Sequence, residues 1–318
     1  MLKFYRTFVF SFGATVFLLS ASFTASAQLR FPQPSQKASV MQTVGVTDVT
    51  IVYSRPGVKG RKIWGDWPVA VPGEATLDDQ NTRPAGAPIV PYGHVWRTGA
   101  NNATQFIVTD DVLINGQPLP AGTYSLHTIP GKDEWTVIFN SVADLGGSFD
   151  YDAKKDVLRV KTKAEVSDRL TEWLDFSLDP AKENSLVARI SWANVSVPFA
   201  IEVKDMATVV LNKARSVVAA AKSDDWQTPF QAANYARANK ATDDAAKWYE
   251  QALRGIDEQI KVRPSYLNLQ RRANTLLNAG RREEGIAAAE RALEAGKAEK
   301  ADTSALEKRI AELKAAKK

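Results

Sequence analysis

The sequence contains no cysteine, two histidines and three methionines among its 318 residues. Without cysteine there is no disulfide bond, no thiol nucleophile and no thiolate zinc site. The two histidines, His94 and His127, are too few for the imidazole set of a metal-binding jelly roll, and no glutamate is patterned beside them. We therefore expect no metal and no other cofactor, and a hydrogen-bonded or surface role for a histidine remains open.

The common catalytic motifs are also missing. There is no G-x-S-x-G, H-E-x-x-H, P-loop or G-x-G-x-x-G pattern. Asp150, Asp152 and Asp156 have a spacing that partly resembles a calcium loop, but the central glycine and the closing glutamate are absent. We interpret these aspartates as a solvated turn, and the sequence alone does not establish an enzymatic activity.

The N-terminus has the three parts of a secretory signal peptide. Lys3 and Arg6 precede an apolar run over residues 8–20, and small residues around Ala25 and Ala27 follow it. The alternative is a membrane anchor, but the run is shorter than the roughly 20 residues of a membrane span. We expect residues 1–27 to be removed, leaving an exported protein in the periplasm or outside the cell, with no membrane span and no nucleic-acid partner.

The first part of the mature chain has the alternation of antiparallel strands. After a loose leader over residues 28–37, a β domain is expected over 38–204, with turns at Thr47–Asp48 and Ala193–Asn194. The expected strands are 40–46, 49–53, 103–109, 112–114, 122–128, 135–140, 157–163, 172–178, 186–192 and 195–203. Many short strands without an intervening helix indicate a β-sandwich or jelly roll. Residues 72–88, polar and rich in proline and glycine, are interpreted as a surface insertion.

Residues 205–318 have a different composition, in which alanine, lysine, glutamate and arginine replace the strand-forming residues. The expected helices are 206–222, 229–239, 243–261, 264–278, 282–295 and 303–316. Ala233 and Ala252 recur as Ala273 and Ala292 at an offset of 40, which indicates repeated helical hairpins. In the second of these units, residues 279–293 resemble the second helix of a tetratricopeptide repeat. The offset of 40 differs from the period of that family, and the Trp-Leu-Gly signature of its first helix is missing. The fold class is thus an α+β multidomain chain, and its helices are expected to bind a protein partner.

Three motif-rich stretches lie between the expected strands. They are residues 54–61, residues 91–104 with the sequence PYGHVWRTGANNAT, and residues 119–140 with LPAGTY and IPGKDEWTVIFN. Together with the DVLRV stretch at 156–160, they make the region 38–203 similar to the DUF2911 family of secreted bacterial proteins. The resemblance implies export and a β domain, and it implies no activity. The insertion at 72–88 departs from the family pattern.

These stretches also supply the candidate ligand site. Arginine offers a rigid fork of donors for carboxylate, phosphate or sugar groups, and aromatic walls beside polar groups are typical of ligand pockets. The candidate residues are Arg55, Arg61, Tyr92, His94, Trp96, Arg97, Asn101, Thr104 and His127. We expect Arg55, Arg61, Arg97 and Asn101 to converge on one pocket for a small polar or glycan ligand. The alternative is that Arg97 pairs with an internal acid and that Trp96 belongs to the core.

Two functions are compatible with this sequence. The favoured one is an exported binding or scaffold protein of the cell envelope, without enzymatic activity. The alternative is a hydrolase or other enzyme that acts on glycans or small anionic molecules at the arginine- and asparagine-lined site.

The signal peptide generates the first prediction. Because the small residues at positions 25 and 27 place the cleavage site before Gln28, protein from the native host should begin at Gln28. N-terminal sequencing of that protein, with fractionation of the cells, measures this. An intact Met1, or protein held in the membrane fraction, would contradict the prediction.

Overall fold

The computed structural model describes residues 31–67, 86–148 and 150–316. The chain divides into a unit that ends at Pro34 and a unit that begins at Ser35, and all the elements below belong to the second. The expected signal peptide and most of the expected insertion lie outside the described residues. Among the described helices, none is both long enough and apolar enough to cross a membrane.

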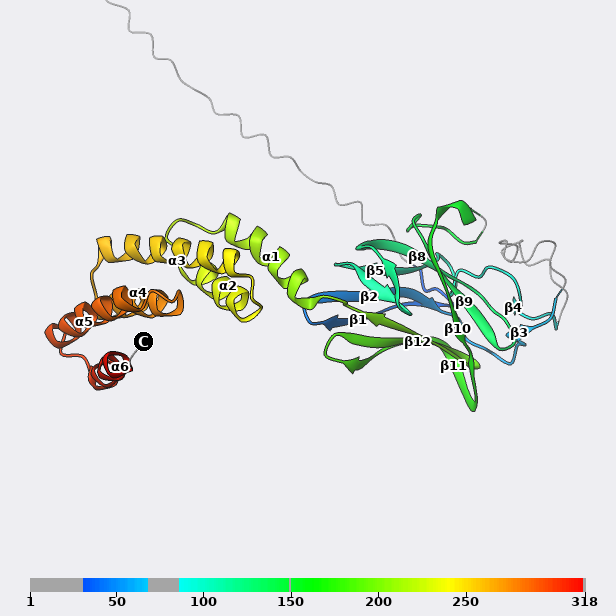
Figure 1. Cartoon of the computed structure of the whole chain (residues 1–318). Helices are drawn as coiled ribbons and strands as arrows, with labels where there is room; N and C mark the ends of the chain where they lie inside the picture. The colour runs from blue at the N-terminus through cyan, green and yellow to red at the C-terminus, as the bar shows by residue number, and fades with distance from the viewer. Residues whose placement is uncertain (1–30, 68–85, 149, 317–318) are drawn as a thin grey trace, which may run out of the picture. The chain divides into compact units, whose positions relative to one another are not determined.

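Two antiparallel sheets form the first part of this unit (Figure 1). Across the larger sheet the order is β1 (Gln36–Val44), β2 (Thr47–Arg55), β5 (Thr104–Val108), β8 (Gly122–Ile129), β9 (Glu134–Asn140) and β10 (Asp156–Lys163). Across the smaller sheet it is β11 (Glu165–Lys182), β12 (Ser185–Glu202), β6 (Val112–Ile114) and β7 (Gln117–Leu119). A short parallel pair, β3 (Trp64–Gly65) with β4 (Val90–Pro91), lies in the connection between β2 and β5.

Alternating apolar residues of both sheets make one shared core. Phe106 and Phe139 come from the larger sheet and Ile190 and Phe199 from the smaller, and all four are at most 2% exposed. The rings of Phe139 and Phe199 meet between the sheets with centroids 6.1 Å apart. Because each such side chain contributes about 1.5–3 kcal/mol on burial, the inward faces explain why these segments form sheets that pack together. The predicted β-sandwich is confirmed.

The first hairpin turns earlier than the sequence pattern predicts. Val44 pairs with Thr47, so the turn consists of Gly45 and Val46, and Thr47 and Asp48 lie within β2. Gly45 has φ +62°, a conformation that glycine adopts without the steric cost of a side chain. The predicted turn at Thr47–Asp48 is therefore wrong. β1 also begins at Gln36, inside the expected leader.

The second correction concerns β12. The predicted turn at Ala193–Asn194 is wrong, because β12 continues through both residues. Ala193 has φ +54° and pairs with Thr171 where the register between β11 and β12 shifts. A single left-handed residue of this kind produces a bulge, which bends the strand without reversing it. The two expected strands 186–192 and 195–203 are thus one.

Six helices follow the sheets. They are α1 (Met206–Ala220), α2 (Gln227–Ala238), α3 (Thr242–Val262), α4 (Tyr266–Asn278), α5 (Arg282–Ala298) and α6 (Ser304–Ala315). Their contacts are built on small side chains, since Ala233, Ala252, Ala273 and Ala292 are at most 1% exposed. Alanine permits the close approach of neighbouring helices. The predicted helical C-terminal region is confirmed.

Candidate functional site

A cavity of about 410 Å³ opens in the β domain beside the short β3–β4 pair. Its basic lining residues are Arg61, Lys62 and Lys132, and its aromatic ones are Trp64, Tyr92 and Trp135. This volume lies within the range of about 300–1,000 Å³ that is typical of small-molecule sites. Arg61 and Tyr92, which the sequence suggested as binding residues, therefore line the same cavity.

Four tryptophans pack together beside this cavity, and two of them, Trp64 and Trp135, line it. Trp64 meets Trp96, Trp135 and Trp192 edge-on, at centroid distances of 5.6, 5.0 and 5.6 Å. Trp96 and Trp192 stack on each other at 5.6 Å. Trp96, Trp135 and Trp192 are buried, whereas Trp64 is half-buried and faces the cavity. The alternative interpretation of Trp96 is the correct one, because its side chain is part of the core.

Trp64 has one polar atom that the fold leaves unsatisfied. Its Nε1 is buried and has no hydrogen-bond partner among the described residues. The indole of Trp96, in comparison, donates to the Gly99 carbonyl at 3.1 Å. An indole nitrogen can only donate, so Trp64 Nε1 is a buried donor without an acceptor among the described residues.

The basic groups of the cavity are held in different ways. Arg61 donates from Nη2 to the Gly57 carbonyl at 2.5 Å and from Nε to the Val58 carbonyl at 3.2 Å. Lys132 pairs with Asp66 at 3.1 Å on the surface. Lys62 forms no ion pair within the described ranges, and its alkyl chain packs so close to Gly65 that a Cβ there would lie 2.8 Å from Lys62 Cε.

The hydroxyl of Tyr92 belongs to the same environment. Burial raises the pKa of Tyr92, Asp66 raises it further, and Lys132 opposes these effects. Tyr92 therefore stays protonated at neutral pH and is available as a neutral hydrogen-bond donor.

Other predicted site residues connect parts of the fold. Arg55 donates from Nε to the Leu174 carbonyl at 2.8 Å and pairs with Asp175 at 3.1 Å, which links β2 to β11. Asn101 donates from Nδ2 to the Ser35 carbonyl at 3.1 Å. Thr104 donates to the Thr98 carbonyl at 2.7 Å. None of these three side chains lines the cavity described above.

Arg97 and His127 lie in another place, on the face of the larger sheet that points away from the core. Trp96 and Thr128 exchange backbone hydrogen bonds of 2.8 and 2.9 Å, which places the adjacent Arg97 opposite His127. The cavity that Arg61 lines is not lined by Arg55, Arg97 or Asn101. The geometry thus does not bring the four predicted residues to one pocket. His94 is buried near this region and does not line the cavity either.

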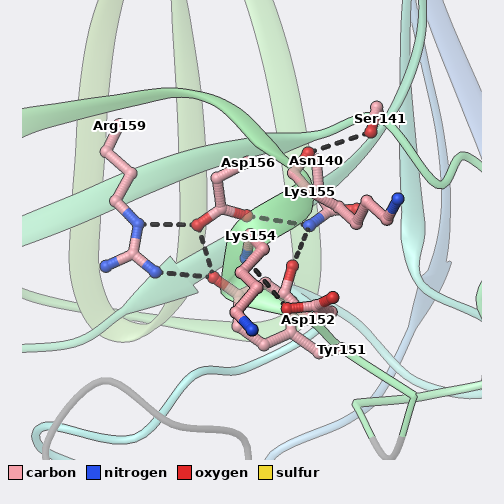
Figure 2. Close-up of polar contacts among 8 residues, drawn as sticks. All are labelled: Asn140, Ser141, Tyr151, Asp152, Lys154, Lys155, Asp156 and Arg159. Atoms are coloured by element: carbon pink, nitrogen blue, oxygen red, sulfur yellow. Dashed lines mark hydrogen bonds and ion pairs between the residues drawn. The ribbon is translucent and has the colours of Figure 1, made fainter.

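A polar network lies at the ends of β9 and β10 on this outer face (Figure 2). The Asp156 carboxylate accepts from the Tyr151 hydroxyl at 2.7 Å, from Arg159 Nε at 2.7 Å and from Asn140 Nδ2 at 2.8 Å. Arg159 Nη2 also donates to the Tyr151 hydroxyl, at 2.8 Å. Asp152 accepts from the backbone of Lys154 and caps a short 3₁₀ helix, Ala153–Lys155. These aspartates therefore organise a structured connection, and the solvated turn that we expected is wrong for Asp156.

His127 is enclosed beside this network. Its side chain is fully buried, and its ring centroid lies 5.0 Å from that of Tyr151. Burial lowers the pKa of His127 to about 4, against the opposing effects of Asp156 and the Ser125 backbone, and Arg97 lowers it further. Burial likewise lowers the pKa of Arg97. His127 is therefore neutral at neutral pH, because its buried environment disfavours an added charge.

The region that holds the cavity matches a known protein family. A family model described as "Protein of unknown function (DUF2911)" matches residues 35–201, which is more than half of the chain. The chain belongs to the DUF2911 family. The DUF2911 region contains the cavity, the four tryptophans and the polar network, and the six helices follow it. The searches of curated proteins and of solved structures found no match.

The cavity also contains residues that we did not propose from the sequence. Lys62, Lys132 and Trp135 were not among the candidates, although Lys132 and Trp135 belong to the IPGKDEWTVIFN motif. Their position in that motif was the available signal. Isolated lysines are usually surface residues, so their type alone did not indicate a site.

The buried histidine generates a prediction about pH. Burial places the folded-state pKa of His127 below its ordinary value of 6.5, so the native state binds fewer protons than the unfolded state between pH 6.5 and 4. This contribution to stability is complete above pH 6.5 and falls as the pH falls towards 4. Between pH 7.5 and 5 the wild type should lose about 2 kcal/mol more free energy of unfolding than His127→Gln.

Urea denaturation of both proteins at the two pH values measures this difference. The two proteins share every other titratable group, so the difference between them reports on His127. An equal pH dependence in the two proteins would contradict the burial of a neutral His127.

Proposed function

We propose that the chain is an exported, non-enzymatic binding protein of the bacterial cell envelope. Its β domain holds a small polar or glycan ligand in the cavity lined by Trp64, Tyr92 and Lys132. The observation that carries the proposal is this cavity, which combines three aromatic walls with several side-chain donors.

The lining favours binding over the hydrolytic alternative. Among the described residues that line the cavity, there is no aspartate, glutamate or histidine. Glycoside hydrolysis ordinarily needs a pair of carboxyl groups, and acyl transfer needs a base beside its nucleophile. The raised pKa of Tyr92 keeps its hydroxyl protonated and suits it to donating a hydrogen bond.

The helical region supplies the second part of the proposal. We propose that it is a tetratricopeptide-like array of helical hairpins that binds a protein partner, with the domain boundary near residue 204. The support is that repeated positions have the same environment: Ala233 and Ala273 are 0% and 1% exposed, and Ala252 and Ala292 are both 0% exposed. Stacked hairpins of this kind commonly present partner-binding surfaces.

The binding proposal predicts that the protein carries its ligand from the cell. Native mass spectrometry of protein purified from the native host should show an added small-molecule mass. The variant Ala164→Phe should reduce this added mass strongly, because Ala164 lines the cavity and the larger ring would fill it. As a matched control, Ala298→Phe introduces the same ring at an exposed position of α5 and should retain the added mass.

Two results of this mass-spectrometry experiment would count against the proposal. Wild-type protein without any added mass, or equal retention by Ala164→Phe and the wild type, would contradict ligand binding in this cavity. Circular dichroism of the variant confirms that its fold is intact.

A further inference from the structure

We propose that the ligand of this cavity is a small amphipathic anion, whose charged group lies at Lys62 and Lys132 and whose apolar part packs against Trp64. The inference rests on the proposed function, since it names the chemical class of the molecule that the cavity binds. It narrows the ligand from any polar molecule or glycan to one with a carboxylate, sulfonate or phosphate and a flat or apolar body.

The charge of the cavity lining favours an anion. Three basic residues and no acidic residue line the cavity in the described part of the chain. Arg61 donates to neutral backbone carbonyls, which fix its position and leave its charge uncompensated. Lys62 has no ion pair within the described ranges. A cavity with this excess of positive charge attracts anions.

Lys132 can exchange its ion-pair partner Asp66 for a ligand. In the ion pair between Lys132 and Asp66, the two side chains are 66% and 77% exposed, respectively. Surface pairs of this kind contribute little free energy to folding. An anionic group on a ligand can replace Asp66 with no loss of a buried contact. Tyr92, which lies close to both charges, adds a neutral donor beside this position.

The fixed position of the Trp64 ring, which lines the cavity, also favours such a ligand. Edge-on contacts with three other indoles restrict the reorientation of the ring. The ring therefore presents a fixed apolar surface to the body of the ligand.

Exposed apolar side chains in the lining favour an amphipathic molecule over a fully polar one. Val166 and Leu170 of β11 also line the cavity, and they are 70% and 59% exposed. A neutral sugar has little apolar surface with which to cover them. An apolar ring or short chain removes these side chains from water, which favours binding.

Two fluorescent probes that share one aromatic skeleton test the inference. The anionic probe is 8-anilinonaphthalene-1-sulfonate, and the neutral probe is N-phenyl-1-naphthylamine. Titrated into the purified protein at low ionic strength, the anionic probe should bind at least about tenfold more tightly, and added salt should reduce this advantage. Lys62→Gln combined with Lys132→Gln should weaken the anionic probe about tenfold and change the neutral probe less than twofold.

The matched control carries the same change of charge elsewhere on the β domain. Lys154→Gln combined with Lys155→Gln alters two exposed lysines of the short 3₁₀ helix and should leave both affinities unchanged. If the variant with both cavity lysines replaced does not fold, Lys62→Gln alone still tests the inference. This single change breaks no ion pair among the described residues.

The outcomes separate the two proposals. Equal affinities for the two probes, both reduced by Ala164→Phe, would overturn the anionic class and leave a binding cavity. Binding of neither probe, or binding that Ala164→Phe does not change, would overturn the cavity itself as a binding site. A loss of anionic-probe affinity in the control variant equal to that in the cavity variant would show a general charge effect and would also overturn the inference.

Discussion

The contact of Trp64 with three other indoles is the interaction on which the candidate site depends. The four tryptophans come from segments far apart in the sequence: the connection after β2, the segment before β5, β9 and β12. Each aromatic pair contributes about 0.5–1.5 kcal/mol beyond the burial of its surface. Their packing fixes Trp64 and therefore the neighbouring Arg61 and Lys62. Lys132 lies in the turn just before β9, and Trp135 lies in β9 itself. The packing of Trp135 therefore brings Lys132 to the same cavity.

Two polar regions of the domain differ in how far the protein satisfies its own groups. Around Asp156 the carboxylate has three donors from Tyr151, Arg159 and Asn140, so the network is internally complete. Around the cavity, the Lys62 ammonium has no ion pair among the described residues, and the Arg61 guanidinium donates to uncharged backbone carbonyls. Complete networks rigidify a fold, whereas convergent unsatisfied groups beside a cavity suit a ligand. This contrast assigns architecture to the first region and supports a binding role for the second.

The regular elements of the structure could be predicted because their periodicity is local. The six helices were placed within a few residues of their observed bounds, and the alternation Trp135, Val137, Phe139 correctly indicated an inward face of β9. The turns were harder. Gly45 and Ala193 adopt left-handed backbone conformations for reasons that depend on strand register, which a local pattern does not specify.

The site could be predicted only in part for a related reason. Backbone hydrogen bonds from Ile89 to Lys62 and from Tyr92 to Gly65 bring the two sides of the cavity together across a long connection. Arg61 and Tyr92 were suggested by their residue types and do line it. Arg55 and Asn101 were suggested on the same ground, and they link strands and loops instead. The sequence identified residue types that can bind a ligand, but it did not indicate whether each side chain points into the cavity or towards another strand.

The central claim is that the cavity beside Trp64 binds an amphipathic anion. The most direct measurement is a crystal structure of the protein purified from its native host. The account predicts a bound molecule in the cavity, with an anionic group within hydrogen-bond or ion-pair distance of Lys62 or Lys132 and an apolar part against the ring of Trp64. A cavity that holds only water, or a bound molecule that is uncharged or contacts none of these residues, would contradict the account.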